Sequence, residues 1–438
     1  MKKAMVLGMG ISGNGAKTLL EKEGYMVIAV DDKLAMSSEE AMKYLDDIEV
    51  FIKSPGVPYT PLVKAVQEKG IKVQDEIEIA YQYMVKTNRN MTIVAVTGTN
   101  GKTTTTSKIA ELLNYAGKKA AAAGNIGRSF VDVLLSEENY EYAVLELSSY
   151  QLENVYEFTP YISLVTNLTP DHLTRYETLK DYYDTKFRIC QNQKEENSFF
   201  LYNIDHEELR KRENLMKGKK ISLSKEQDAD TCVRNGKIIF QEEEIMQVSE
   251  LSLKGNHNLE NSLFIITAGK LLGLDTKVIR EFLMNTEPLE HRMERCFQYG
   301  KVQFINDSKG TNIDSAKFAL EAYPGCILIC GGFDKKVDLN PLADIIVKQV
   351  KEVYLIGVIA EKIKSLLLER NYPVEKIYSL ETIENSLLDM KKRFTKEDEE
   401  LILLSPATSS FDQFKSFEHR GQVFRISLQN FRIKWSEI

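Results

Sequence analysis

The chain has 438 residues, a formal net charge of −7, 43% hydrophobic residues and 28% charged residues. This composition excludes a disordered chain, and the length predicts about three domains. No apolar run reaches the ~18 residues of a membrane helix, and the acidic balance disfavours a generic nucleic-acid binder. Five scattered cysteines are typical of reduced thiols, and we expect no signal peptide. We therefore expect a cytoplasmic globular protein that binds neither membranes nor nucleic acids.

The first part of the chain alternates strand and helix signals. Apolar runs predict strands, a glycine loop follows the first of them, and a later polar stretch predicts a linker. The expected strands are 4–7, 25–30 and 50–52, the loop is 8–13, the helix after it ends at Gly24, and the linker is 86–90.

The rest of the chain repeats this alternation in two further blocks. In the second block the expected strands are 93–96, 142–145 and 161–165, followed by a strand-rich region at 199–248 and a helix at 258–272. In the third block the expected strands are 302–305, 326–330, 353–356 and 401–404. Three consecutive α/β domains with mainly parallel sheets are the simplest fold that fits this pattern. We place them at 1–89, 90–286 and 287–438.

The strongest single motif runs from Gly98 to Thr104, between an apolar strand and a helical run. Its small residues let backbone N–H groups turn toward phosphates, Lys102 can reach the β- and γ-phosphates, and the Thr103 hydroxyl can bind Mg²⁺. The usual form of this motif begins with glycine where this chain has Val96, so the loop is a variant. It predicts a nucleoside triphosphate site.

A second glycine loop, from Gly8 to Gly13, fits the dinucleotide fingerprint G-x-G-x-x-G, and Asp31 follows at about the position of a ribose-binding acid. Alone, this loop would predict an NAD enzyme. However, the P-loop begins before a second mononucleotide-binding half could be completed. A nucleotide-linked substrate would satisfy the loop as well as NAD does, so the residues alone leave both ligands open.

Three further side chains are candidates for chemistry beside the P-loop. Glu146 and His172 each follow a predicted strand, so both are expected at the carboxyl edge of the sheet. Both are candidate Mg²⁺ partners, although Mg²⁺ prefers the oxygen ligand. Lys186 lies among aromatic residues and, on the sequence alone, can equally be a surface lysine of a helix.

Taken in order, these motifs resemble those of the Mur ligase family, ATP-dependent enzymes that join an amino acid to a UDP-linked cell-wall precursor. The resemblance spans essentially the whole chain. The motifs that carry it are 8–13, 54–56, 97–104, 124–127, 146–153, 167–172, 257–261, 291–294, 306–312 and 404–414. It implies an α/β protein with a Rossmann-like first domain, a P-loop ATPase-like central domain and a Rossmann-like third domain.

The resemblance also implies which residues bind each ligand. ATP would contact Gly98, Asn100, Gly101, Lys102, Thr103, Thr104, Asn258, Arg292 and Asp307, and the UDP-linked substrate would contact Gly10, Ser12, Asp32, Ser54 and Asn125. The incoming amino acid would contact Lys309, Thr311, Lys335, Ser410 and Phe417, with Lys336 as an alternative to Lys335.

The catalytic set implied by the resemblance is Lys102, Glu146, His172 and Lys186. Two Mg²⁺ ions would be served by Thr103, Glu146, His172 and a carbamylated Lys186. Carbamylation requires a neutral amine, which burial among aromatic residues favours. The general base would be His172 or Asp171.

Two segments, 307–312 and 410–414, point to the family member that adds D-glutamate to UDP-N-acetylmuramoyl-L-alanine through an acyl phosphate, in peptidoglycan precursor synthesis. A monomer is expected. The alternatives are another ligase of the superfamily, with a different amino acid or of the folylpolyglutamate type, and an NAD-binding protein built on the first loop. The glycine-loop domain at the N-terminus disfavours the folylpolyglutamate type, which begins at its P-loop domain.

Overall fold

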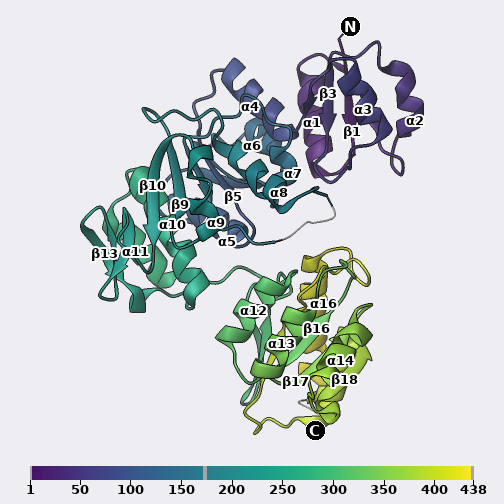
Figure 1. Cartoon of the computed structure of the whole chain (residues 1–438), viewed down its shortest axis with the longest axis vertical. Helices are drawn as coiled ribbons and strands as arrows, with labels where there is room; N and C mark the ends of the chain where they lie inside the picture. Colours follow the sequence, from purple (N-terminus) through teal and green to yellow (C-terminus); the bar gives the residue numbers. More distant parts are fainter. Residues whose placement is uncertain (1, 171–174, 436–438) are drawn as a thin grey trace. The chain divides into compact units, whose positions relative to one another are not determined.

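The computed structural model describes residues 2–170 and 175–435, with side chains as far as Gln429. Contacts divide the chain into a first unit, Met1–Thr286, and a second unit, Glu287–Ile438. The described residues form three sheets, two in the first unit and one in the second (Figure 1). In the described parts of the chain, no helix combines the length and the apolar character that crossing a bilayer requires.

The first sheet has four parallel strands in the order β2-β1-β3-β4. Its region contains β1 (Lys3–Leu7), α1 (Ile11–Lys22), β2 (Met26–Val30), α2 (Ser38–Ala41), the 3₁₀ helix η1 (Met42–Tyr44), β3 (Val50–Lys53), α3 (Pro61–Glu68), β4 (Val73–Gln74) and α4 (Glu76–Lys86). The three expected strands and the loop between strand and helix are confirmed. β4 was not predicted, because two residues are too few to show an alternating pattern.

The second sheet has nine strands in the order β13-β12-β11-β10-β9-β8-β5-β7-β6. Its elements are β5 (Thr92–Thr97), α5 (Lys102–Tyr115), β6 (Ala120–Gly124), α6 (Phe130–Leu135), β7 (Tyr142–Glu146), α7 (Ser149–Leu152), β8 (Ile162–Val165), α8 (Leu179–Lys186), η2 (Phe187–Cys190), β9 (Phe199–Asn203), α9 (Glu207–Arg210), η3 (Glu213–Leu215), β10 (Lys219–Ser224), β11 (Thr231–Arg234), β12 (Lys237–Phe240), β13 (Glu243–Gln247), η4 (Val248–Glu250), α10 (Asn256–Leu271) and α11 (Thr276–Asn285). Pairing is parallel from β6 to β11 and antiparallel from β11 to β13. The P-loop strand β5 therefore lies inside the sheet, between β7 and β8.

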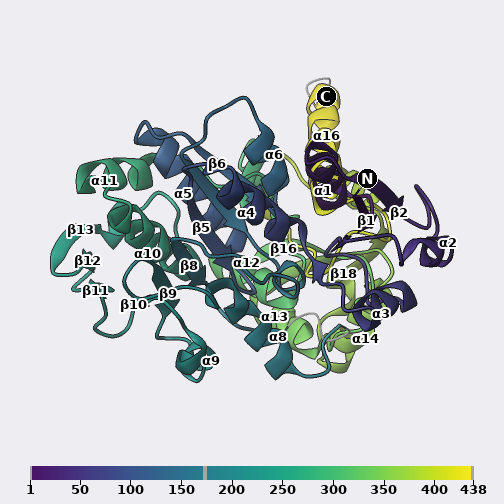
Figure 2. The ribbon, with the colours of Figure 1, turned by 90° about the horizontal axis from the view of Figure 1, so that it is seen from above.

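Alternation along β5 explains the layers on the second sheet. Ile93 and Ala95 face a core that includes residues of α4 and α6, whereas Val94 and Val96 face a core that includes residues of α5 and α10. Figure 2 shows α5 and α10 beside β5 and β8. Burying each of the Ile93, Val94 and Val96 side chains contributes roughly 1.5–3 kcal/mol. The α4 side of this core also contains buried residues of α1, so one continuous core joins the first two sheets.

The third sheet forms the second unit, with the order β14-β15-β19-β16-β17-β18 and parallel pairing except between β14 and β15. Its elements are β14 (Glu294–Tyr299), β15 (Val302–Asn306), α12 (Ile313–Ala322), β16 (Cys326–Gly331), α13 (Asn340–Gln349), β17 (Val350–Ile356), α14 (Ala360–Glu369), η5 (Val374–Lys376), β18 (Ile377–Glu381), α15 (Ile383–Arg393), β19 (Leu401–Leu404) and α16 (Phe417–Trp435). One face packs on α12, α13 and α14, and the other packs on α15 and α16. The four strands expected in this block are confirmed.

All five cysteines are free thiols. Cys190, Cys232, Cys326 and Cys330 are buried and Cys296 is half-buried. Burial raises the pKa of the Cys190 thiol to about 11 and the pKa of the Cys326 and Cys330 thiols to about 12. The prediction of reduced, core-packed thiols at 326 and 330 is therefore confirmed.

Candidate active site

The predicted P-loop lies between β5 and α5. Gly98 and Gly101 have φ values of +139° and +82°, which favour glycine. Packing excludes side chains as well: a Cβ would lie 2.0 Å from Thr166 Oγ1 at Gly98 and 2.5 Å from Asn261 Oδ1 at Gly101. Val96, which replaces the usual first glycine, is a fully buried residue of β5. The strand continues to Thr97, and the loop is correspondingly shorter.

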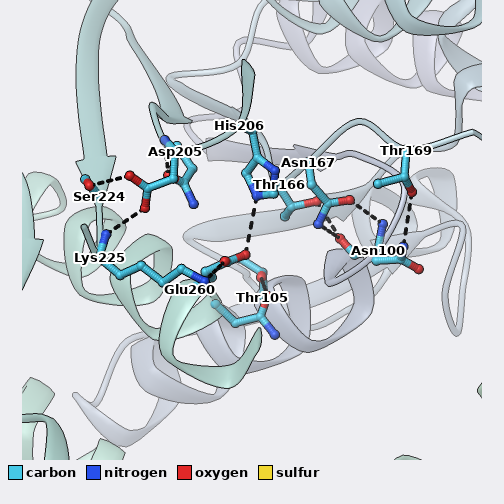
Figure 3. A network of polar contacts seen from close by, with 12 residues as sticks. Asn100, Thr105, Thr166, Asn167, Thr169, Asp205, His206, Ser224, Lys225 and Glu260 are labelled. Atoms are coloured by element: carbon cyan, nitrogen blue, oxygen red, sulfur yellow. Dashed lines mark hydrogen bonds and ion pairs between the residues drawn. The ribbon is translucent and has the colours of Figure 1, made fainter. Parts of the chain in front are cut away.

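Residues after the neighbouring strand β8 hold the P-loop in shape (Figure 3). The backbone N–H of Asn100 donates to Asn167 Oδ1 at 2.9 Å, and Thr166 Oγ1 donates to the Asn100 carbonyl oxygen at 2.6 Å. Asn100 Nδ2 donates to Thr169 Oγ1 at 3.4 Å. The role of these partners in bracing the loop was not predicted, because it depends on β8 pairing with β5. The loop is therefore preorganised by contacts around Asn100.

Two predicted lysines meet at one carbonyl group of the loop. Lys102 Nζ donates to the carbonyl oxygens of Gly98, at 3.1 Å, and Thr99, at 2.7 Å. Lys186 is 2% exposed, and its Nζ donates to the same Gly98 oxygen at 3.0 Å. It lies 4.3 Å from the centroid of the Tyr182 ring. The surface-lysine alternative for Lys186 is therefore wrong, and the two amines lie beside the predicted phosphate site.

Glu146 is the last residue of β7 and lies opposite Val96 of β5 in the register. It is 2% exposed, and Oε1 accepts a hydrogen bond from Asn125 Nδ2 at 2.8 Å. Oε2 has no hydrogen-bond partner among the described residues. Thr103 and Thr104 lie in the first turn of α5, where the helix N-terminus favours anions. A buried carboxylate with one uncommitted oxygen is suited to a cation.

His172 and Asp171, predicted as a metal ligand and as candidate bases, lie outside the described residues. The chain approaches them through Asn167, which contacts the P-loop, and leaves them at Arg175. Their roles stay predictions.

The start of α10 carries Asn258. Beside it, Glu260 forms a charged network with Lys225 and His206 (Figure 3). Asn258 Nδ2 donates to the Lys254 carbonyl oxygen at 2.9 Å, so its amide closes the turn before the helix. Glu260 pairs with Lys225 at 2.7 Å and with His206 at 3.4 Å. Burial alone would raise the pKa of Glu260, but the hydrogen bonds from His206 and Lys225 outweigh it and lower the pKa. The network ties α10 to the loops after β9 and β10.

The first glycine loop is closed by internal contacts. A Cβ on Gly13 would lie 1.8 Å from the Gly8 carbonyl oxygen, whereas a Cβ on Gly10 would meet nothing within 4 Å. Asp31 Oδ2 accepts from the Met9 backbone N–H at 2.9 Å, and this hydrogen bond is the largest cause that lowers the Asp31 pKa. The acid at the ribose-binding position therefore supports the loop itself, which weakens the NAD alternative.

The other residues predicted for the UDP-linked substrate lie around this loop. Ser54 Oγ donates to the Gly8 carbonyl oxygen at 2.7 Å, so its hydroxyl joins β3 to the loop. Ser12 is half-buried in the first turn of α1. Asp32 is exposed and accepts from the Ser38 backbone N–H at 2.7 Å. Asn125 lies in the second sheet's region, where it contacts Glu146.

In the second unit, Asp307 follows β15 and is 4% exposed. It accepts from Ser405 Oγ at 2.8 Å and from the Met293 backbone N–H at 3.3 Å. Burial raises its pKa to about 7, against the opposing effect of the Ser405 hydrogen bond. Arg292 adds a positive charge that also acts against the rise.

The residues predicted for the amino acid lie in the same unit. Lys309 Nζ is 4.8 Å from the centroid of the Phe417 ring, and Lys335 Nζ donates to the Thr311 carbonyl oxygen at 3.0 Å. Ser410 is buried. Lys336 is exposed. Of these two lysines, Lys335 is the one whose ammonium group contacts Thr311, another residue of the predicted set.

Arg420 was not predicted. It is fully buried, and burial lowers its pKa to about 10. Its guanidinium group donates to Ser308 Oγ at 3.0 Å, to the Ser308 carbonyl oxygen at 2.8 Å and to the Thr408 carbonyl oxygen at 3.0 Å. These contacts fix the backbone beside Asp307 and Lys309. No local pattern signals them, because Ser308 is 112 residues away in the sequence.

Comparison with known proteins places this geometry in a family. The Mur ligase middle domain matches residues 96–269. A UDP-N-acetylmuramoylalanine–D-glutamate ligase of Fusobacterium nucleatum is 58% identical over 425 residues, which cover 97% of this chain and 98% of that protein. The chain belongs to the Mur ligase family. A UDP-N-acetylmuramoylalanine–D-glutamate ligase of Caldanaerobacter subterraneus is 34% identical, covering 98% of this chain and 99% of that protein.

Solved structures of Mur ligases share the fold. The UDP-N-acetylmuramate–alanine ligase MurC of Thermotoga maritima matches with a TM-score of 0.61 at 18% identity, covering 98% of this chain and 99% of that one. MurF of Acinetobacter baumannii matches with a TM-score of 0.64 at 14% identity, covering 97% and 93%. The expected multi-domain α/β fold class of a Mur ligase is therefore confirmed.

Proposed function

We propose that this Mur ligase joins D-glutamate to the alanyl carboxyl group of UDP-N-acetylmuramoyl-L-alanine, with cleavage of ATP to ADP and phosphate, in peptidoglycan precursor synthesis. The observation that carries the proposal is the P-loop with Lys102 and Glu146, in a chain 58% identical over nearly its whole length to a ligase of that name. ATP and Mg²⁺ are the required co-reactants of the family.

The chemistry requires an activated carboxyl group. The alanyl carboxylate attacks the γ-phosphorus of ATP, and the bond between that phosphorus and the oxygen that bridges the β- and γ-phosphates breaks. The products of this step are an acyl phosphate and ADP. The amine of D-glutamate then adds to the acyl carbon, a base takes its proton, and phosphate is expelled. Because two anions meet in the first step, charge neutralisation is the main task of the protein.

Lys102 meets that demand on the ATP side. Its Nζ is held by two carbonyl oxygens of the loop, at the start of a helix whose N-terminal amides favour phosphate. Gly98, Asn100, Gly101, Thr103 and Thr104 complete the proposed phosphate cradle, and Asn258, Arg292 and Asp307 are proposed for the nucleoside.

Thr103 and Glu146 fit Mg²⁺, because hydroxyl and carboxylate oxygens are the ligands it prefers and Glu146 Oε2 has no partner among the described residues. When bound, Mg²⁺ neutralises charge on the β- and γ-phosphates. We keep His172 in the proposed metal set, and His172 or Asp171 as the base, on the sequence argument.

A second Mg²⁺ would use Lys186 as a carbamate, in which the neutral amine adds to CO₂ and releases a proton. Burial of Lys186 beside Tyr182 supports this proposal, because burial disfavours the ammonium form. The modification would replace a cation by a carboxylate-like ligand next to the P-loop.

For the remaining ligands we keep the sets predicted from the sequence. The UDP-linked substrate would contact Gly10, Ser12, Asp32, Ser54 and Asn125, and D-glutamate would contact Lys309, Thr311, Lys335, Ser410 and Phe417. The division into domains at 1–89, 90–286 and 287–438, a cytoplasmic location, a monomeric state and the absence of membrane or nucleic-acid partners belong to the same proposal.

Phosphate release tests the reaction. Release is expected only with ATP, Mg²⁺, UDP-N-acetylmuramoyl-L-alanine and D-glutamate together, and turnover with L-glutamate but not D-glutamate would exclude the proposed substrate. Glu146→Gln should lower turnover about 10²-fold or more, because it removes a metal-binding charge. Stripping CO₂ at moderately alkaline pH should lower activity, and unchanged activity would exclude a functional carbamate on Lys186.

A further inference from the structure

A second group of charged residues surrounds the loop Ser54–Val57, which follows β3. Lys53 is the last residue of β3, and its side chain is fully buried. Its Nζ donates to the carbonyl oxygens of Ser54, at 3.2 Å, and Val57, at 2.9 Å. The ammonium group therefore closes the loop by binding both of its ends.

The closed loop packs on the first glycine loop. Ser54 Oγ donates to the Gly8 carbonyl oxygen at 2.7 Å, and the Ser54 backbone N–H donates to the Leu7 carbonyl oxygen at 2.8 Å. A Cβ on Gly8 would lie 2.6 Å from Val57 Cγ2. Because the fit is this close, a shift of Ser54–Val57 must shift the glycine loop as well.

Arg175 reaches the same loop from the segment after β8. Nη1 donates to the Val57 carbonyl oxygen at 3.2 Å, and Nε and Nη2 donate to the two carboxylate oxygens of Glu153, at 3.2 and 2.7 Å. The guanidinium carbon lies 4.5 Å from the centroid of the Tyr150 ring. A guanidinium group that is both bidentate and stacked has a fixed orientation, which an ammonium group cannot reproduce.

Tyr59 provides another contact between the two segments. Its hydroxyl donates to Asn154 Oδ1 at 3.2 Å, and its ring centroid lies 5.4 Å from Lys53 Nζ and 5.7 Å from the Arg175 guanidinium carbon. Burial and the charge of Arg175 lower the pKa of Lys53 to about 8. Keeping this ammonium group buried therefore lowers the free energy of unfolding. Such costly polar arrangements are expected where function requires a defined geometry.

We propose that Lys53, Glu153 and Arg175 are positioning residues for the UDP-linked substrate, because they tie the loop Ser54–Val57 to the segments after α7 and β8. The inference rests on the proposed function, which takes the first glycine loop as the UDP site. None of the contacts described above for this bridge involves a P-loop residue. Breaking it therefore weakens binding of the UDP-linked substrate and leaves ATP binding unchanged.

Titration calorimetry with UDP-N-acetylmuramoyl-L-alanine and, separately, with ADP and Mg²⁺ measures the two sites of the full chain. In Lys53→Met and Arg175→Lys we expect the Kd for the UDP-linked substrate to rise about tenfold or more, and the Kd for ADP to stay within about twofold. Steady-state kinetics should show a raised KM for the UDP-linked substrate with kcat within about threefold. Since Arg175 and Glu153 act as a pair, Arg175→Lys combined with Glu153→Gln should lose little more than either change alone.

Matched controls are present elsewhere in the chain. Arg393 pairs with both carboxylate oxygens of Glu352, at 3.1 and 2.9 Å, and lies 4.4 Å from the Tyr378 ring centroid. Arg393→Lys therefore makes the same chemical change in the second unit. Lys270 is a largely buried lysine, 2.8 Å from Glu243, and Lys270→Met is the control for Lys53→Met. Both controls should keep the Kd for the UDP-linked substrate within about twofold.

If Lys53→Met does not fold, Tyr59→Phe tests the same contacts with a milder substitution. This change removes only a hydroxyl from a side chain that is 42% exposed, and it should raise the Kd for the UDP-linked substrate about threefold. An unchanged Kd in folded Tyr59→Phe and Arg175→Lys overturns the inference and leaves the proposed function intact. A parallel loss of ADP binding also overturns it. Wild-type protein that does not bind the UDP-linked substrate overturns the proposed function together with the inference.

Discussion

The two glycine-rich loops of the first unit share one pattern, strand then loop then helix, and differ in how their polar groups are used. In the P-loop, two lysines donate to the Gly98 carbonyl oxygen, and a buried glutamate at the end of the neighbouring strand keeps one oxygen without a described partner. In the first loop, no described lysine or arginine side chain donates to residues 8–13, and the nearby acid, Asp31, accepts the loop's own N–H. Among the described residues, lysine side chains therefore contact the P-loop and not residues 8–13.

The difference shows how the same backbone arrangement, a glycine loop before a helix N-terminus, can serve two functions. The helix N-terminus suits phosphate in both loops, because the exposed amides and the helix dipole are the same. The lysine and carboxylate groups beside the P-loop make it suited to phosphoryl transfer between two anions. The first loop has no such lysine contact in the described part of the chain and is suited to binding a phosphate-bearing group without reacting with it. Five substitutions test this contrast.

The largest effect is expected from Lys102→Ala. Removing the Lys102 cation should lower phosphate release about 10³-fold, because Lys102 is the proposed phosphate-binding cation at the start of α5 and the proposed carbamate on Lys186 would leave that second lysine without a positive charge. Titration calorimetry should show the Kd for UDP-N-acetylmuramoyl-L-alanine within about twofold of wild type. Lys22→Ala, an exposed lysine in the helix after the first loop, is the control. If Lys102→Ala weakened binding of UDP-N-acetylmuramoyl-L-alanine as strongly as it lowered phosphate release, the two loops would not act independently.

Gly98→Ala and Gly13→Ala compare the packing of the two loops. Gly98→Ala combines a φ of +139° with a Cβ 2.0 Å from Thr166 Oγ1, and it should lower the free energy of unfolding by about 3 kcal/mol. Gly13→Ala places a Cβ 1.8 Å from the Gly8 carbonyl oxygen and should cost about 2 kcal/mol. Urea unfolding measures both. A smaller cost at Gly98 than at Gly13 would contradict the expectation that the positive φ of Gly98 adds strain when a side chain is introduced there.

Gly10→Ala separates binding from stability. A Cβ at Gly10 meets nothing within 4 Å, so the free energy of unfolding should change by less than about 0.5 kcal/mol. If Gly10 is kept small so that a phosphate-bearing ligand can approach the backbone, the Kd for the UDP-linked substrate should rise about tenfold. An unchanged Kd in calorimetry would remove Gly10 from the proposed site.

Asp31→Asn should have the smallest effect and a defined pH dependence. Backbone hydrogen bonds, first that of Met9, hold the pKa of folded Asp31 below its ordinary value of 3.8. The carboxylate therefore stabilises the folded chain above that value, and the contribution is lost as pH falls through the folded pKa. The difference in Tm between wild type and variant should be present at pH 6 and shrink below pH 4. Glu21→Gln, an exposed change in α1, should show no such trend.

Local patterns in the sequence predicted the loops and strands, because each lies within a few consecutive residues. Lys102 and Thr103 were predicted from the glycine-loop motif and Glu146 from its place at a strand end, and the structure confirms that β5 and β7 are neighbours. Lys186 was ambiguous on the sequence, since nothing near it shows that Gly98, 88 residues away, accepts its hydrogen bond.

Long-range pairings could not be predicted from the sequence. The contact of Thr166 with Asn100 depends on the order of strands, and the contacts of Arg420 with Ser308 join segments 112 residues apart. Asp31 illustrates a different limit, because its spacing from the loop fits a ribose-binding acid, while Oδ2 accepts from Met9 of the loop and Oδ1 accepts from the backbone of Lys33 and Leu34. Spacing specifies where a side chain lies and leaves open which partner it takes.

The buried thiols have a practical consequence for following this enzyme at work. Since only the thiolate reacts with alkylating reagents, the raised pKa of Cys190, Cys326 and Cys330 should make these three thiols slow to label near neutral pH, and Cys232 is shielded from reagents by burial. Cys296 is half-buried, and burial raises its pKa to about 12 as well. One engineered surface cysteine in each unit could therefore carry a fluorophore pair on an otherwise wild-type background, and energy transfer between the dyes would report how the two units respond to each substrate in turn.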